Sequence, residues 1–136
     1  MTEIAVRESD SLPYDPNDRY RSGSGTVLLT GVQAIVRQLV EQHVRDIRDG
    51  RRVATFVSGY PGSPLGGLDK LLHGMPKVLA EHDITFTPGF NEELAATSVW
   101  GGSQGGQLGA GTPTHDGGVV GVWYGKAPAS IAPPMR

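Results

Sequence analysis

Two adjacent carboxylates, Glu92 and Glu93, begin a helical pattern in the stretch GFNEELAATSVWGG, residues 89–102. Asn91 directly before them suits an N-cap, and acids in the first turn interact favourably with the positive end of the helix dipole. Capping accounts for both acids at roughly a few tenths of a kcal/mol each. It does not account for the small residues that follow, which indicate that something packs very close. A carboxylate facing an apolar ligand at this point would have a raised pKa and could share a proton with it.

A second candidate is the stretch SGYPGSPLGG, residues 58–67, with four glycines and two prolines. Glycine lets the backbone approach a ligand closely, and proline fixes the turn. An ordinary tight turn between a strand and a helix would have the same composition, so both interpretations stay open. The stretch is not a Walker A loop, because no Gly-Lys-Ser/Thr follows to supply the phosphate-binding lysine.

The elements that must position these residues alternate along the chain. Apolar residues at three- and four-residue steps predict an amphipathic helix over 31–49, with Thr30 and Gln33 as a capping box and Gly50 as the stop. The stripe consists of Val32, Ile35, Val36, Leu39, Val40, Val44 and Ile47. The short apolar runs 53–58, 84–89 and 118–124 suit buried parallel strands. A helix interrupted at Gly74 and Pro76 precedes the second strand, and another over 91–101 follows it.

This order of strands and helices predicts an α/β fold with a parallel sheet and right-handed crossovers. In such sheets ligands collect at the carboxyl edge, where strands end and helices begin. Both candidate stretches fall at that edge. We expect Leu94, Ala95, Ser98 and Val99 to face inward on the helix over 91–101, and Trp100 and Trp123 to belong to the core.

Composition excludes several classes of function. The 136 residues suit one domain, and a net charge of −2 gives no electrostatic case for binding nucleic acid or an anionic membrane. Without cysteine the chain has no disulfide, thiolate metal site or Fe–S ligand, and its four histidines show no metal-ligand spacing. No transmembrane run or signal peptide is evident, which favours a cytoplasmic protein. The arginines of 37–52, with Asp46 and Asp49, are expected on a solvated helix face.

The two ends differ from the middle. Residues 1–25 combine charges, prolines and SGSG, which predicts an extended or disordered leader, and residues 126–136 form an irregular proline-rich tail. The ordered part is expected over residues 26–125.

Three blocks of the sequence resemble a known family. FVSGYPGSPLGGLD, PGFNEELAATSVWGGSQ and DGGVVGVWYGKAP are similar to successive blocks near the N-terminus of bacterial indolepyruvate ferredoxin oxidoreductases, within the thiamine-diphosphate-dependent 2-oxoacid:ferredoxin oxidoreductases. The resemblance covers roughly residues 24–128, in the same order and spacing. The pair Tyr-Pro-Gly-Ser-Pro and Asn-Glu-x-x-Ala makes it specific.

The resemblance implies a three-layer thiamine pyrimidine-binding domain of the PYR type, incomplete at its C-terminus. In that family one glutamate at a helix start bonds N1′ of the cofactor's aminopyrimidine, which prepares thiamine diphosphate to decarboxylate a 2-oxoacid. Glu92 matches that glutamate because Asn91 directly precedes it. The family's alanine and glycine that follow the glutamate correspond to Ala95 and Gly101 for Glu92, and equally well to Ala96 and Gly102 for Glu93. Only the asparagine directly before Glu92 therefore distinguishes the two acids.

The first loop carries the remaining residues that the resemblance implies. Tyr60, Pro61 and Gly62 would lie against the cofactor, and Ser63 falls on the family's serine or threonine near the substrate. The family's reaction is the oxidative decarboxylation of an aryl 2-oxoacid such as indolepyruvate, a substituted pyruvate, to its acyl-CoA, with reduction of ferredoxin. Its Mg²⁺, its 4Fe–4S clusters and the diphosphate-binding domain belong to parts that this chain lacks, so the chain is expected to be inactive alone.

Two alternatives remain beside this enzyme piece. The chain could be a non-catalytic truncated remnant that folds poorly or associates with a longer subunit. In either case a homo-oligomer or a partner subunit is expected. It could also be a small α/β module that binds a nucleotide or anion at the YPGSP loop. Nucleotide binding without thiamine binding would favour the last.

Overall fold

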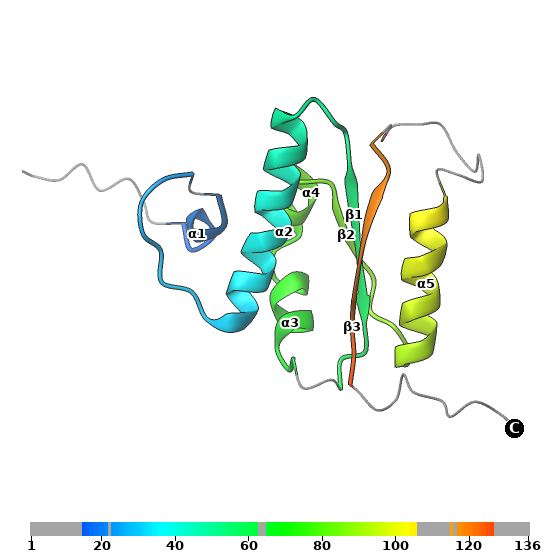
Figure 1. Cartoon of the computed structure of the whole chain (residues 1–136). Helices are drawn as coiled ribbons and strands as arrows, with labels where there is room; N and C mark the ends of the chain where they lie inside the picture. The colour runs from blue at the N-terminus through cyan, green and yellow to red at the C-terminus, as the bar shows by residue number, and fades with distance from the viewer. Residues whose placement is uncertain (1–14, 22, 63–64, 106–114, 116, 127–136) are drawn as a thin grey trace, which may run out of the picture.

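A computed structural model describes residues 15–21, 23–62, 65–105, 115 and 117–126. Within them three parallel strands form one sheet, with helices on both faces (Figure 1). The strands are β1 (Ala54–Gly59), β2 (Ile84–Phe86) and β3 (Val119–Tyr124). Helices α2 (Gly31–Arg48), α3 (Leu68–His73) and α4 (Pro76–Glu81) cover one face, and α5 (Glu92–Gln104) covers the other. The short helix α1 (Asp18–Arg21) lies against the outer side of α2.

The strand order is β2-β1-β3, so β1 is central and its two neighbours run parallel to it. Thr55 pairs with Ile84 on one side and with Val120 on the other. The predicted α/β class with a parallel sheet is therefore confirmed in this coarse form. The strands predicted over 53–58 and 118–124 form with bounds that differ by at most one residue, and of the run 84–89 only Ile84–Phe86 is a strand.

Helix α2 begins with the predicted capping box. The Gln33 N–H donates to the Thr30 hydroxyl oxygen at 3.4 Å, and the Thr30 N–H donates to the Gln33 side-chain oxygen at 2.9 Å. This exchange satisfies two N–H groups that a helix start leaves without partners. The other end follows the prediction as well, because Gly50 turns the chain with a φ of 75°.

The main core lies between the sheet and the α2 side. Its buried members are Tyr20, Val36, Leu39, Val40, Val57, Leu68, Leu72, Met75, Val78, Leu79, Ile84 and Tyr124. None of them belongs to α5. Val44 and Ile47, which close the predicted stripe of α2, are exposed instead. The apolar stripe of α2 therefore packs against the core from Val32 to Val40 but not at Val44 and Ile47.

Several expectations need correction. Within the predicted leader, Asp18–Arg21 is helical and Tyr20 is buried, because Tyr20 finds apolar partners on α2 and α3. Asp46 is also buried rather than solvated. Its carboxylate accepts a hydrogen bond from the Gln42 amide and pairs with Arg51, which compensates the loss of water. Residues 25–30 form no regular element.

Candidate functional site

The carboxyl ends of the strands and the start of α5 meet at one edge of the sheet (Figure 1). The connection between β2 and α5 is tied to the end of β1, because the Gly89 N–H donates to the Gly59 carbonyl at 2.9 Å. Gly89 is required here, since a Cβ at this position would lie 2.6 Å from the Cβ of Ala95 on α5. The loop that leaves β1 and the start of α5 therefore begin side by side, at the predicted edge.

Glu92 and Glu93 occupy the first turn of α5 as predicted. The Asn91 side chain caps the helix by accepting a hydrogen bond from the Leu94 N–H at 2.8 Å. Glu92 is half-buried and Glu93 is exposed. The Trp123 indole N–H donates to the Glu92 carbonyl oxygen at 3.1 Å. Glu92 is thus the less exposed of the two acids, and its backbone carbonyl is tied to Trp123 at the end of β3.

The first loop is described in part. Tyr60, Pro61 and Gly62 are exposed, while Ser63 and Pro64 lie outside the described residues. A Cβ at Gly62 would lie 2.6 Å from the Tyr60 ring, so glycine allows the ring to fold back over the loop. The relation of Ser63 to Glu92 therefore remains a prediction.

The inner face of α5 consists of small residues. Ala95 is buried, and a Cβ at Gly102 or Gly121 would press on Phe56 or Val99 respectively. The helix therefore packs very close to the sheet, as its composition suggests. The inward placement of Leu94 and Ser98 is wrong, because both are exposed, Leu94 to 51%.

Both tryptophans also depart from the expectation of a core position. Trp100 is 67% exposed on α5, and Trp123 is 36% exposed at the end of β3. Phe90, directly before the cap, is 91% exposed. Trp123, which the sequence analysis assigned to the core, lies beside Glu92 at the carboxyl edge. Strand alternation gives the signal for it, because Val122 and Tyr124 face the core and the residue between them must face α5.

The Tyr124 hydroxyl is buried without a hydrogen-bond partner in the part of the chain that the structure describes. Its ring packs on Gly59, where a Cβ would lie 2.5 Å from three ring carbons. Burial, reinforced by the negative charge of Asp69, raises the pKa of Tyr124. Tyr124 therefore stays neutral at physiological pH and supports the carboxyl edge from the α3 side.

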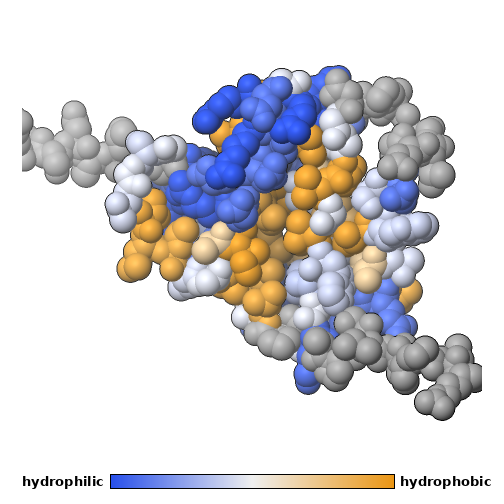
Figure 2. Space-filling view, viewed as in Figure 1, coloured by the Kyte–Doolittle hydropathy of each residue, from blue (hydrophilic) through white to orange (hydrophobic). Residues whose placement is uncertain are grey.

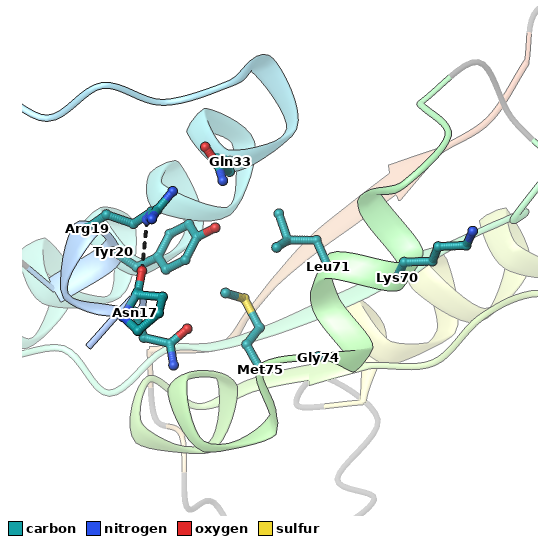
Figure 3. A pocket seen from close by; sticks show the side chains of 9 residues that line it. Asn17, Arg19, Tyr20, Gln33, Lys70, Leu71, Gly74 and Met75 are labelled. Carbon is teal, nitrogen blue, oxygen red and sulfur yellow. Dashed lines mark hydrogen bonds between the residues drawn. The ribbon is translucent and has the colours of Figure 1, made fainter. Parts of the chain in front are cut away.

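Two hollows of the described surface lie away from this edge. One of about 280 Å³ opens between α1, α2 and α3 (Figure 3). Tyr20, Leu71 and Met75 point into it, and Arg19 and Lys70 lie at its rim. Another of about 410 Å³ lies at the amino edge beside Asp83 and His115. Neither hollow includes Glu92 or Tyr60.

Among the described residues no group of three His, Asp or Glu side chains could hold a metal ion. None of the helices in this part of the chain is long and apolar enough to cross a membrane.

Comparison with protein-family models, with curated proteins and with solved structures finds no match to this chain.

Proposed function

We propose that this chain contributes the pyrimidine-binding half of a thiamine diphosphate site in an indolepyruvate-type 2-oxoacid:ferredoxin oxidoreductase. The three sequence blocks suggest the family. The observation that carries the proposal is the half-buried Glu92, which starts α5 at the carboxyl edge between β1 and β3. The finer assignment of the fold as a PYR-type domain belongs to the same proposal.

The residues at this edge fit an aminopyrimidine. The ring requires an acid beside N1′ and apolar surface for its two faces. Glu92 offers the acid, and Tyr60, Phe90 and Trp123 offer exposed aromatic surface at the same edge. The Mg²⁺ that accompanies the diphosphate does not fit, because the described residues hold no group of His, Asp or Glu side chains that could bind a metal ion. The chain therefore supplies one half of the site.

Each residue then has a specific task. When bound, the cofactor serves as the electron sink for decarboxylation of the 2-oxoacid. The Glu92 carboxylate holds a proton at N1′ through a charge-assisted hydrogen bond. The Asn91 side chain, which accepts from the Leu94 N–H, and the Trp123 indole, which donates to the Glu92 carbonyl, both hold the backbone of the first helical turn. Glu93 remains a surface acid near the helix dipole, and Ser63 remains assigned to the substrate by the resemblance.

The complete reaction needs partners. Oxidative decarboxylation to an acyl-CoA requires CoA, ferredoxin and Fe–S clusters, and a chain without cysteine provides no ligands for such clusters. We therefore assign to this chain binding of the pyrimidine half without turnover, in a cytoplasmic protein.

Binding of free thiamine tests the proposal directly, because thiamine carries the aminopyrimidine without the diphosphate. Trp123 contacts the Glu92 backbone and so reports on the site by its fluorescence. We expect thiamine and thiamine diphosphate to quench the fluorescence with similar affinity, and ATP to have no effect. Glu92→Gln should weaken thiamine binding about tenfold, the value for a charged hydrogen bond of about 1.5 kcal/mol.

Glu93→Gln is the matched control, since it removes the same charge one residue away on the same helical turn. We expect its thiamine affinity to stay within about twofold of that of the unmodified chain. Binding of ATP in place of thiamine would favour the anion-binding module. Absence of binding to either compound would favour the non-catalytic remnant. If only Glu93→Gln weakened thiamine binding, the roles assigned to the two acids would have to be exchanged.

A further inference from the structure

The outer edge of β3 has the features of a pairing surface. The ladder between β1 and β3 begins where the Ala54 N–H donates to the Gly118 carbonyl at 3.2 Å. Peptide groups of successive residues in a strand point to alternate sides, so Val119, Gly121 and Trp123 direct theirs away from β1. In the part of the chain that the structure describes, no strand pairs with that side.

The two edges of the sheet differ in protection. Natural edge strands are commonly kept short, charged or interrupted by proline, which prevents pairing with other chains. β2 follows this rule, because it has three residues and begins after Asp83, whose carboxylate pairs with His115 at 3.6 Å. β3 has six residues, VVGVWY, and carries neither charge nor proline. Figure 2 shows apolar residues gathered between α2 and α5, where β3 runs.

We propose that two copies of this chain associate through their β3 edges, antiparallel, about a two-fold axis at Gly121. The two three-stranded sheets then join into one six-stranded sheet. This surface and its partner do not depend on the proposed function.

A second copy fits this edge because the strand is complementary to itself. With Gly121 opposite its own equivalent, Val119 lies opposite Trp123 of the second copy. Val119 and Trp123 both direct their N–H and C=O groups outward. Each can therefore donate one hydrogen bond to the facing residue and accept one from it, as in a hydrogen-bonded antiparallel pair. Val120 lies opposite Val122 of the second copy on the α2 side, where β-branched side chains pack closely across strands. No like charges meet, because the strand has none.

The register is also compatible with the helices. A two-fold axis normal to the sheet leaves both copies of α5 on the same face of the joined sheet and both copies of α2 on the other. Pairing along six residues buries less than the roughly 1,200 Å² of a stable, specific interface. We therefore expect weak, concentration-dependent association of the full chain.

Amide hydrogen exchange by NMR tests both the partner and the register. We compare the full chain at about 10 µM and about 1 mM, concentrations that bracket weak association. The N–H groups of Val119, Gly121 and Trp123 should gain at least about tenfold protection at the higher concentration. Those of Val120, Val122 and Tyr124, which point to β1, should change little. Sedimentation should show a shift from monomer to dimer over the same range.

A lysine on each edge provides the matched variants. Val120→Lys places a charge on the β3 edge and should abolish the dimer, whereas Thr85→Lys on the β2 edge should leave it unchanged. A monomer at both concentrations would overturn the proposal. So would a dimer in which the N–H groups of Val119, Gly121 and Trp123 gain no protection, because that dimer would use another surface. Since exchange is measured on the unmodified chain, unfolding of Val120→Lys would not decide the outcome.

Discussion

At the scale of single residues, the packing at the carboxyl edge can be compared at two glycines whose surroundings differ. Gly59 ends β1 under the ring of Tyr124, and a Cβ there would lie 2.5 Å from three ring carbons. Gly101 lies in α5 with no heavy atom within 4 Å of such a Cβ. An added methyl group would therefore clash with the Tyr124 ring at Gly59 and would have free space at Gly101.

We expect Gly59→Ala to lower the free energy of unfolding by about 1–3 kcal/mol, the usual cost of overpacking. Gly101→Ala should raise it by about 0.5–1 kcal/mol, because alanine restricts the unfolded chain and favours the helix. Urea denaturation of both variants measures the difference. Equal effects of the two substitutions would contradict the close packing of Tyr124 on Gly59.

Residue patterns predicted the site unevenly, and the reason is physical. The Asn91 cap and the first-turn positions of Glu92 and Glu93 were predicted correctly because capping is decided by neighbours along the chain. The facing of α5 was predicted wrongly because large apolar residues were expected inside. The close approach of α5 to β1 and β3 admits only small side chains there, so Leu94 points to solvent. That approach depends on contacts distant in sequence, which periodicity does not report.

At the scale of elements, two arginines tie α1 to the body of the protein. Arg21 donates to both carboxylate oxygens of Glu81, at 2.9 and 3.1 Å, and pairs with Asp15 at 2.9 Å. The Arg37 guanidinium also donates to the Arg19 carbonyl at 2.6 Å. These contacts place Tyr20 in the core, although the sequence around it predicted an unstructured leader. Four helical residues cannot form a stable helix alone, so tertiary contacts decide this element.

The charges of this arrangement predict how α1 responds to pH. The Asn17 backbone N–H, and after it Arg21, hold the pKa of Asp15 below its ordinary value, and Arg21 does the same for the pKa of Glu81. A lowered pKa contributes stability at pH values above the unfolded pKa and loses it as the pH falls through the folded one. The ordinary values are 3.8 and 4.5, so α1 should detach as the pH falls below that range.

The NMR signals of the Tyr20 ring, observed from pH 7 to pH 2, follow this detachment. Arg21→Gln should release Tyr20 already at neutral pH, because both carboxylates lose their partner. Arg51→Gln is the control, since Arg51 pairs instead with Asp46 of α2 and with Asp49, the residue that follows this helix. If Tyr20 stays buried in Arg21→Gln, apolar contacts alone hold α1 and the ion pairs add nothing measurable.

At the scale of the whole molecule, the two faces of the sheet are unequal. The α2 side carries the main core, in which α2 buries Val36, Leu39 and Val40. On the other side α5 packs on β1 and β3, and Ala95 is its one fully buried residue. Each fully buried valine or leucine contributes roughly 1.5–3 kcal/mol. The sequence predicted that both helices form, but it did not predict how much less apolar surface α5 buries than α2.

This asymmetry predicts that α5 opens before the rest of the molecule. Local opening needs less free energy where few apolar contacts are broken, so amides in the middle of α5 should exchange at least about 30-fold faster than those of α2, about 2 kcal/mol in opening free energy. Hydrogen exchange at low protein concentration measures both helices in the same sample, and the amides of α2 are the internal control. Equal protection would mean that the molecule unfolds as one unit and that small-residue packing holds α5 as firmly as the core holds α2. Because α5 begins with Glu92, a ligand bound at the carboxyl edge should slow exchange in α5 and leave α2 unchanged.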